Sequence, residues 1–472
     1  MITVDKQDAI TLKLSQVMAA SKKTELDFYL FVPGELGLGP EVIKESEIYF
    51  SSLHQKRTYF SDKTHLPLVH SRLAKRGIVS SAQYRVSLSL YGYQYVVALD
   101  KSVADLNAKA EKEQAIDEDS VDDVIDLALD ILKRLRRSVP FDEGMKRYYA
   151  NIDNYLSWYT EQQFLSLVAH LPREGDYKTV KERLLTIAEK EIAHRKLNNY
   201  NSENVRKSAT RMSNKMRLLR RLIEHPIVLK EESTSLGANL QRMVKGIATG
   251  FVMVFVTVTA IMARDYWGEI TASFIIAMSF VYALREIFKD DLRDIMWRWV
   301  RKGRAKWRRR YFDPTTKKAV GQKLEWLEFT SLSKLPDRIK TIRKKRVAQR
   351  EEQILHYRYE VEMATSRFLS GYEQTRENLY LNMRFLTRLM DKGSNKIYRL
   401  NNGQVVKDSV EKRHLLNLIA REVNEKGEAT YYRWKLVMNR SKVVDVEAIP
   451  VAEMKPKFLG TDEVTPASSQ KV

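Results

Sequence analysis

Residues 247–284 read IATGFVMVFVTVTAIMARDYWGEITASFIIAMSFVYAL, and this stretch decides how the chain is interpreted. Two uncharged apolar runs, 247–263 and 270–284, flank the short polar break RDYWGE. As helices rising about 1.5 Å per residue, the runs cover roughly 25 and 22 Å, slightly less than a hydrocarbon core of about 30 Å. The stretch predicts a two-helix transmembrane hairpin, with a buried helical hairpin or a re-entrant loop as the alternatives.

The remainder of the chain is polar. It has 472 residues, a hydrophobic content of 44%, a charged content of 30% and a mean hydropathy of −0.42. These values describe a mostly water-soluble protein with a small apolar insert and exclude a polytopic transporter. The length of the chain suggests about three domain-sized units. Because the chain has no cysteine, disulfides, thiolate zinc sites and cysteine nucleophiles are excluded.

The distribution of charge predicts an orientation for the hairpin. The net charge is +21, and residues 202–310 alone hold 22 Lys or Arg against 10 Asp or Glu. Basic residues flank both runs, whereas the turn between them holds one Arg against two acids. The positive-inside rule therefore predicts an integral membrane protein with two spans and both termini cytoplasmic.

A basic and aromatic segment follows the second run. Residues 298–310 contain eight basic residues and no acidic ones, interleaved with tryptophan. Such a segment suits contact of cations with phosphate while the rings lie at headgroup depth, so anionic lipids are the expected partner. Its position beside a span disfavours nucleic acid, and a topology signal without a specific ligand is the alternative. The predicted lipid-surface residues are Trp297, Arg298, Trp299, Arg301, Lys302, Arg304, Lys306, Trp307, Arg308, Arg309 and Arg310.

Small residues recur in both runs at a spacing that lets helices approach closely. They are Gly246 and Gly250 near the first run, and Ser273 and Ala277 in the second. We expect these residues to pack the two helices against each other. Self-association of the protein through the two glycines is the alternative.

The flanking sequence indicates two α+β units. On the N-terminal side, alternation predicts strands at 26–32 and 84–99, the latter with a bulge or turn at Gly92, and apolar periodicity predicts helices at 145–171, 178–198 and 203–224. On the C-terminal side we expect a strand at 355–363, a helix at 372–390, a hairpin at 397–406 and three strands between 413 and 449. The expected fold class is an α+β membrane protein, with a transmembrane hairpin between an N-terminal helix-rich α+β domain and a C-terminal antiparallel-sheet domain.

These patterns divide the chain into six predicted units. They are an N-terminal sheet-containing unit at 1–110, a helical cytosolic region at 111–241, the two-span hairpin at 242–285, a basic juxtamembrane helical connector at 286–350, a C-terminal α+β sheet domain at 351–450 and a disordered tail at 451–472.

No motif specifies a reaction. The eight histidines lack metal-ligand spacing, the glycines of residues 34–39 match neither nucleotide-binding pattern, and the S-x-x-K at 331–334 lacks its companion elements. We therefore predict no catalytic, cofactor-binding or metal-binding residue, and enzyme activity stays open.

The function that follows is that of a membrane-anchored interaction or regulatory protein. It would act as a scaffold or sensor, present two cytosolic modules at the inner face of a membrane, and bind protein partners or self-associate. The alternatives are a membrane-tethered enzyme whose active site is not visible as a motif, and an oligomeric pore-forming or membrane-perturbing effector.

Overall fold

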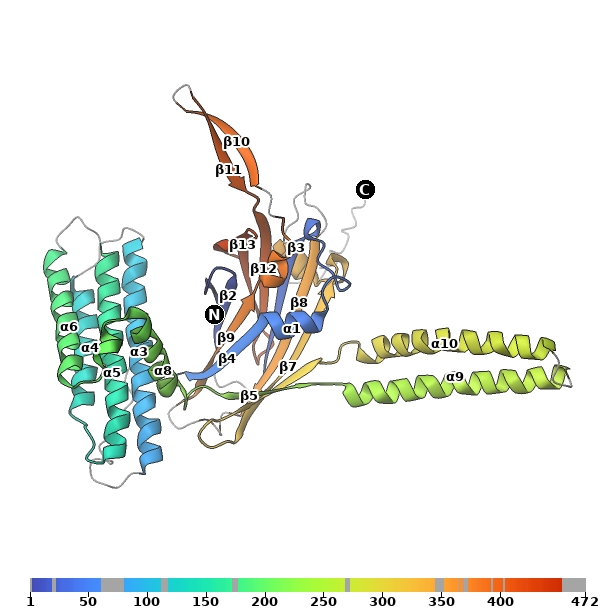
Figure 1. Cartoon of the computed structure of the whole chain (residues 1–472), viewed down its shortest axis with the longest axis horizontal. Coiled ribbons are helices and arrows are strands. Elements are labelled where there is room, and N and C mark those ends of the chain that lie inside the picture. The colour runs from blue at the N-terminus through green and yellow to red at the C-terminus, as the bar shows by residue number, and fades with distance from the viewer. Residues whose placement is uncertain are drawn as a thin grey trace, which may run out of the picture.

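Three parts make up the fold in Figure 1: a β body, a helical bundle beside it, and a two-helix arm that projects on the side away from the bundle. The fold is that of a computed structural model. It describes every residue except 1, 19–22, 61–79, 112–117, 172–176, 268–271, 344–351, 365, 367, 369–371, 392–393, 402–403 and 452–472.

The β body consists of two sheets in which every pairing is antiparallel. The larger sheet has the strand order β14-β13-β12-β3-β8-β7-β6-β5 and the smaller one β1-β2-β9-β4. Apolar side chains from both sheets form one core between them. The strands are β1 (Ile2–Lys6), β2 (Thr11–Met18), β3 (Thr24–Pro33), β4 (Leu53–Phe60), β5 (Lys230–Ser235), β6 (Trp307–Phe312), β7 (Ala319–Thr330), β8 (Glu352–Met363), β9 (Gln374–Asn382), β12 (His414–Val423), β13 (Ala429–Met438) and β14 (Val443–Ile449).

Both ends of the chain contribute to the same sheets. β3 lies between β8 and β12, and β2 pairs with β9. β3 reads as a nearly continuous apolar run because both of its faces are covered, one by the core and the other by α11 (Asp337–Arg343), whose Ile339 packs near Tyr29 and Phe31. The predicted units at 1–110 and 351–450 therefore both contribute strands to one β body.

The helical bundle is inserted between β4 and β5. Its helices are α3 (Ser81–Glu111), α4 (Glu118–Arg136), α5 (Glu143–His170), α6 (Lys178–Leu197), α7 (Glu203–Arg206) and α8 (Ala209–Glu224). The helices predicted at 145–171, 178–198 and 203–224 are confirmed, with a break between α7 and α8. Their apolar faces enclose a second core, separate from that of the β body.

The strand predicted at 84–99 is wrong, because this stretch lies within α3. Its tyrosines and leucines alternate, but they also recur every three or four residues, and that period continues beyond residue 99. The buried positions at this spacing are Tyr84, Leu88, Tyr91, Tyr95, Leu99, Val103 and Leu106. Gly92 is no bulge but a helical residue, where a Cβ atom would lie 3.4 Å from Cγ2 of Ile152 on α5.

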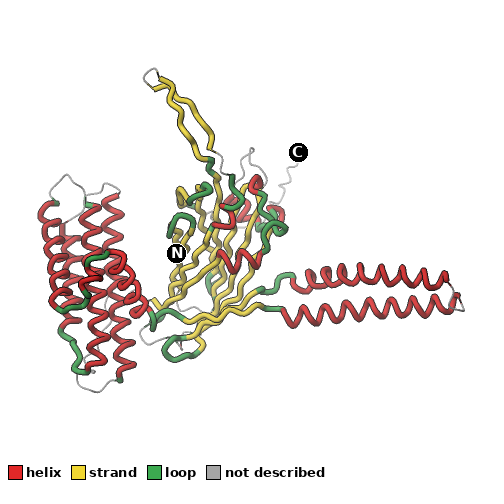
Figure 2. Tube along the Cα trace, in the orientation of Figure 1, coloured by secondary structure: helices red, strands yellow, loops and turns green. Residues whose placement is uncertain are grey.

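Two further predictions concern the C-terminal part. The helix predicted at 372–390 is wrong, since β9 occupies nearly half of it and only α12 (Arg384–Thr387) is helical. The hairpin predicted at 397–406 is confirmed as β10 (Ser394–Asn401) and β11 (Gln404–Glu411), although its turn at 402–403 lies outside the described residues. This hairpin projects from the β body in Figure 2. The predicted tail lies outside the described residues from 452 onward.

The arm consists of α9 (Ala238–Trp267) and α10 (Ala272–Arg301). It connects β5 to β6, which pair with each other, so the two helices are inserted into a β-hairpin at the edge of the larger sheet. Among the described residues, the remaining short helices are α1 (Glu45–Ser52) and two 3-10 turns at Gly34–Leu36 and Leu332–Lys334.

Candidate functional site

The two helices of the arm pack along a narrow seam (Figure 1). On α9 the buried side chains are four residues apart: Val244, Ala248, Val252 and Val256. Near the root of the arm, the Arg293 guanidinium of α10 donates a hydrogen bond of 2.8 Å to the Thr249 hydroxyl of α9. A four-residue repeat covers only one stripe of a helix, so most of α9 does not face α10.

The predicted two-helix transmembrane hairpin is wrong. Among the described residues, one helix is long and apolar enough to cross a membrane, Ala238–Asp265 of α9. The reason lies in α10, whose apolar part at 272–284 covers only about 20 Å as a helix. The same helix then continues through Arg285, Glu286 and Lys289 without a break.

The predicted localisation, an integral membrane protein with two spans and both termini cytoplasmic, is wrong for the same reason. It depends on two crossings, and a single candidate span gives no basis for placing both ends of the chain on one side. The length and composition of one helix are weak evidence that the chain crosses a membrane.

The apolar side chains of the arm are nevertheless exposed. Only 17% of the apolar window of α9 is buried, whereas the core helix of a soluble protein would be mostly buried. Large apolar side chains on both helices are more than half exposed, among them Phe251, Val254, Phe255, Met262, Ile275, Ile276 and Phe280. Exposed apolar side chains in this number are typical of surfaces that contact a membrane or another protein.

The residues predicted to pack the helices lie mostly away from the seam. A Cβ atom at Gly246 or Gly250 would meet nothing within 4 Å, while Ala277 is half-buried. The side chain of Ser273 lies outside the described residues. Helix packing and self-association through these positions stay predictions.

The first half of the predicted lipid-surface segment lies at the root of the arm. Trp299 is 78% exposed, and Arg298, Lys302 and Arg304 are also exposed. Trp297 and Arg301 line a shallow groove of about 580 Å³, where the Arg301 guanidinium carbon lies 5.2 Å from the centre of the Trp297 ring. These residues form an exposed basic collar where the arm meets the body.

The second half of that segment is a strand, and part of it lies inside the body. Trp307 is buried and stacks on Tyr49 with ring centres 3.8 Å apart, and Lys306 pairs with Glu45. Arg309 points into the interior, whereas Arg308 is half-buried and Arg310 exposed. The predicted helical connector at 286–350 therefore ends as a helix at Arg301, and Trp307 and Arg309 are not available to lipid.

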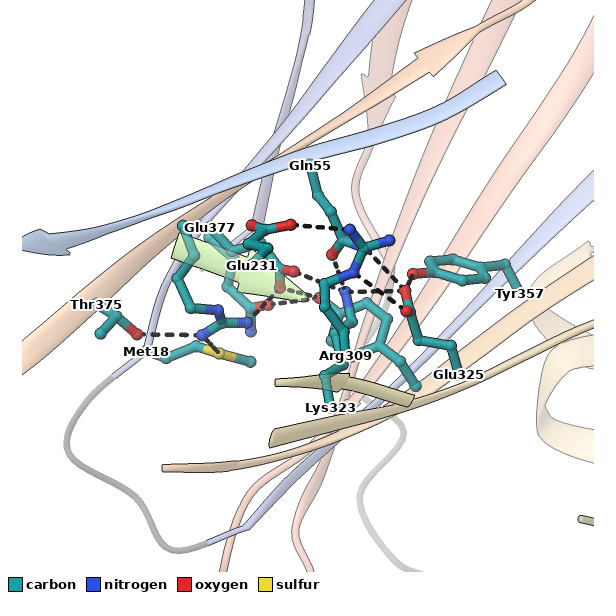
Figure 3. A network of polar contacts seen from close by, with 12 residues as sticks. Met18, Gln55, Glu231, Arg309, Lys323, Glu325, Tyr357, Thr375 and Glu377 are labelled. Atoms are coloured by element: carbon teal, nitrogen blue, oxygen red, sulfur yellow. Dashed lines mark hydrogen bonds and ion pairs between the residues drawn. The ribbon is translucent and has the colours of Figure 1, made fainter. Parts of the chain in front are cut away.

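Six charged side chains, four of them fully buried and two half-buried, cross the interior of the body between the two sheets (Figure 3). We call them the charge chain, because positive and negative members alternate along it. In order, they are Arg57 of β4, Glu377 of β9, Lys323 of β7, Glu325 of β7, Arg309 of β6 and Glu231 of β5. The chain thus runs from the smaller sheet to the two strands that carry the arm.

Short contacts join the members of the charge chain. Glu377 lies 2.8 Å from the Arg57 guanidinium and 2.6 Å from Nζ of Lys323. Nζ of Lys323 lies 3.7 Å from Glu325, and Arg309 then contacts Glu325 at 3.3 Å and Glu231 at 2.8 Å. Because the charge chain holds three cations and three carboxylates, its charges balance one another.

Tyrosine hydroxyls satisfy the remaining lone pairs of two carboxylates. Tyr357 and Tyr49 donate hydrogen bonds of 2.5 and 2.6 Å to Glu325, and Tyr359 donates one of 2.8 Å to Glu377. Burial alone would raise the pKa of Glu377, but Arg57 and Lys323 outweigh it and lower this pKa to about 2. Burial also lowers the pKa of Lys323, against the attraction of the two glutamates. The interior therefore holds ionised groups that depend on one another.

The charge chain was not predicted from the sequence, although one signal points to it. Lys323 and Glu325 have the same parity as the buried Leu327, and Glu377 has the same parity as Leu379 and Leu381. Charged residues in phase with the apolar face of a strand lie inside, where they need partners.

Comparison with known proteins adds no relative: no family model, no curated protein and no solved structure matches this chain. Within the part of the chain that the structure describes, no three His, Asp or Glu side chains gather in a way that would hold a metal ion.

Proposed function

We propose that this chain is a membrane-associated interaction protein, in which the arm attaches to lipid and holds the helical bundle and the β body at the lipid surface. The observation that carries the proposal is the exposure of α9, most of whose apolar window faces outward. Transfer of each exposed Phe or Ile from water into lipid contributes about 1.5–3 kcal/mol.

The basic collar at the root of the arm supports anionic lipid as the preferred surface. Arg298, Lys302 and Arg304 are exposed there, and none forms an ion pair with a residue that the structure describes. Each such cation near an anionic lipid surface contributes about 1 kcal/mol. Apolar and electrostatic contacts would therefore act together.

The β10–β11 hairpin supports a role in binding a protein partner. Its two strands pair only with each other, and Tyr398, Leu400 and Val405 are each more than 60% exposed. An isolated two-stranded hairpin is of marginal stability in water, and a partner would cover both its apolar side chains and its open edges.

Vesicle flotation tests the attachment to lipid. The full chain is mixed with phosphatidylcholine vesicles, with and without phosphatidylserine, and the protein that rises with the vesicles is measured. The test variant carries Phe251→Glu and Phe255→Glu, two exposed positions on α9, and the matched control carries Phe141→Glu in the bundle, where the phenylalanine is 72% exposed.

We expect the wild type and the Phe141→Glu control to float, more strongly with phosphatidylserine, and the double variant of α9 to stay at the bottom. Flotation of the double variant at the level of the wild type would contradict the proposal. Failure of the wild type to float on either kind of vesicle would contradict it as well.

A further inference from the structure

A cleft of about 590 Å³ separates the helical bundle from the outer face of the smaller sheet. One wall is formed by α3, α5 and α8, and the floor by β1, β2, β9 and β4. The volume is within the range of sites for small molecules, which form preferentially where two parts of a protein meet.

Strand alternation assigns the floor of the cleft. Along β9, the odd-numbered residues such as Glu377 point into the body, so the even-numbered Arg376, Asn378 and Tyr380 point outward into the cleft. The same alternation directs Lys56 of β4 outward while Arg57 joins the charge chain. The floor is therefore the polar face of the strands whose other face is the core.

The strand register gathers three cations around Asn378. Its cross-strand neighbours are Ser15 of β2 and Lys56 of β4, and Ser15 donates a hydrogen bond of 2.8 Å to the Asn378 side chain. Arg376 lies two residues from Asn378 and Lys13 two residues from Ser15, on the same face of the sheet but on opposite sides of the Ser15–Asn378 pair, because the strands are antiparallel. Strand spacing places the three cationic residues within roughly 5–8 Å of Asn378, measured between Cα atoms.

The cations of the cleft differ in how they are paired. Lys56 lies 2.5 Å from Glu224 of α8, and Arg220 lies 2.9 Å from the same carboxylate. Arg376 and Lys13, by contrast, form no ion pair with any residue that the structure describes, although Asp5 is the register partner of Lys13.

Arg376 is held in place without a carboxylate. Its guanidinium carbon lies 4.0 Å from the centre of the Phe60 ring, a contact that fixes the planar group. Asp100, which lines the cleft, is attracted to both Arg376 and Lys13 but forms no ion pair with either. Arg376 and Lys13 are both half-buried and flank the Ser15–Asn378 pair from opposite sides, so a phosphate or carboxylate placed between them could accept hydrogen bonds from both.

We propose that this cleft is a binding site for a small molecule that carries a phosphate or carboxylate group. The anionic group contacts Arg376 and Lys13 above the Ser15–Asn378 pair, and the remainder of the molecule packs on Tyr93 and Tyr380, which line the cleft. The site is independent of lipid binding by the arm.

Isothermal titration calorimetry on the full chain in a mild non-ionic detergent tests this site. The probes are pyrophosphate and ATP, which carry phosphate groups, and citrate, which carries carboxylates. The variants are Arg376→Gln and Lys13→Gln, and the control is Lys435→Gln, which removes an exposed lysine of the larger sheet. Lys13→Gln guards against misfolding, since Lys13 lacks the ring contact of Arg376.

We expect at least one probe to bind, and both cleft variants to weaken its binding by about tenfold or more, while the control binds like the wild type. Binding of pyrophosphate or ATP without citrate assigns the site to phosphate, and the reverse assigns it to carboxylate. If no probe binds, or if both cleft variants bind like the wild type, the cleft is only a polar contact between bundle and sheet and the proposal is overturned.

Discussion

The Nζ atom of Lys323 lies 2.6 Å from Oε1 of Glu377, and both side chains are fully buried between the two sheets. Lys323 belongs to β7 of the larger sheet and Glu377 to β9 of the smaller one. The pair therefore joins the two sheets through their common interior. In such surroundings an intact ion pair adds little to stability, but the loss of one partner leaves a buried charge uncompensated.

Glu377→Gln is expected to destabilise the β body strongly. The substitution keeps the shape of the side chain but removes the carboxylate that faces Arg57 and Lys323. Breaking a buried pair costs about 3–5 kcal/mol, so the free energy of unfolding should fall by that amount. Denaturation in urea, followed by tryptophan fluorescence, measures the change.

The control for this substitution is Glu447→Gln. Glu447 pairs with Lys435 at 3.0 Å, but both side chains are exposed. Exposed pairs contribute about 0–1 kcal/mol, so this variant should unfold nearly as the wild type does. Equal losses in the two variants would show that burial of the charge chain has no energetic consequence.

Acid should destabilise the protein through Glu377. Its pKa in the folded state is about 2, below the ordinary value of 4.5, because Arg57 and Lys323 outweigh the effect of burial. Since the folded pKa is the lower one, the stabilisation is complete above pH 4.5 and is lost as the pH falls from 4.5 toward 2. Unfolding midpoints measured across this range should fall more steeply for the wild type than for Glu377→Gln. Parallel curves would contradict the assignment.

His356 should have the opposite dependence on pH. Burial lowers its pKa, but hydrogen bonds with Asp27 and Glu328 outweigh burial and raise it above 6.5. Its Nε2 lies 2.8 Å from Asp27. A raised folded pKa gives stabilisation that is complete below pH 6.5 and is lost as the pH rises through the folded value. Unfolding midpoints should therefore decline above pH 6.5 in the wild type and change less in His356→Gln. If NMR shows that His356 titrates at or below pH 6.5, the prediction is wrong.

Two glycine substitutions should act in opposite directions. At Gly321 of β7, a Cβ atom would lie 2.7 Å from the Glu362 carbonyl oxygen and still closer to Met363, so Gly321→Ala should destabilise the body by about 1–3 kcal/mol. At Gly246 of α9 the space is open, and alanine should stabilise the helix by about 0.5–1 kcal/mol. Thermal unfolding of both variants checks the pair, and a loss of stability in Gly246→Ala would reveal a partner at that position.

Asp142 should stabilise the start of α5. Its side chain accepts a hydrogen bond of 2.8 Å from the backbone N–H of Met145, as an N-cap residue does. Asp142→Ala should lower the stability of the bundle by about 1 kcal/mol, while Asp142→Asn should keep most of it. Helix content followed by circular dichroism during thermal unfolding distinguishes the two variants, and equal losses would argue against capping.

Local patterns predicted the elements whose surroundings are simple. The bundle helices at 145–171, 178–198 and 203–224 and the strands at 355–363 and 413–449 were predictable because one face of each is apolar and the period is clear. The stretch at 84–99 satisfied two periods at once, and only its packing on α5 and α8 selected the helix. The strand at 374–382 was missed because Glu377 occupies an inward-facing position, where the alternation of a strand normally places an apolar residue.

The basic segment after the arm shows a second limit of local reasoning. Read alone, residues 298–310 carry only positive charge, which predicts a surface. Three acids that are distant in sequence change the outcome: Glu45 pairs with Lys306, and Glu231 and Glu325 pair with Arg309. No periodicity identifies partners that the fold alone brings together.

The alternation of the charge chain has a consequence for the descent of this protein. A neutral or reversed side chain at any one of its six positions leaves a neighbour unmatched in the interior, so we expect a single exchange to destabilise the body even when it alters neither the arm nor the cleft. An exchange at a neighbouring position restores the balance. Among chains of common ancestry, we therefore expect Arg57 to vary with Glu377, and Arg309 with Glu231, and this linked variation would identify the body even where its surfaces have diverged.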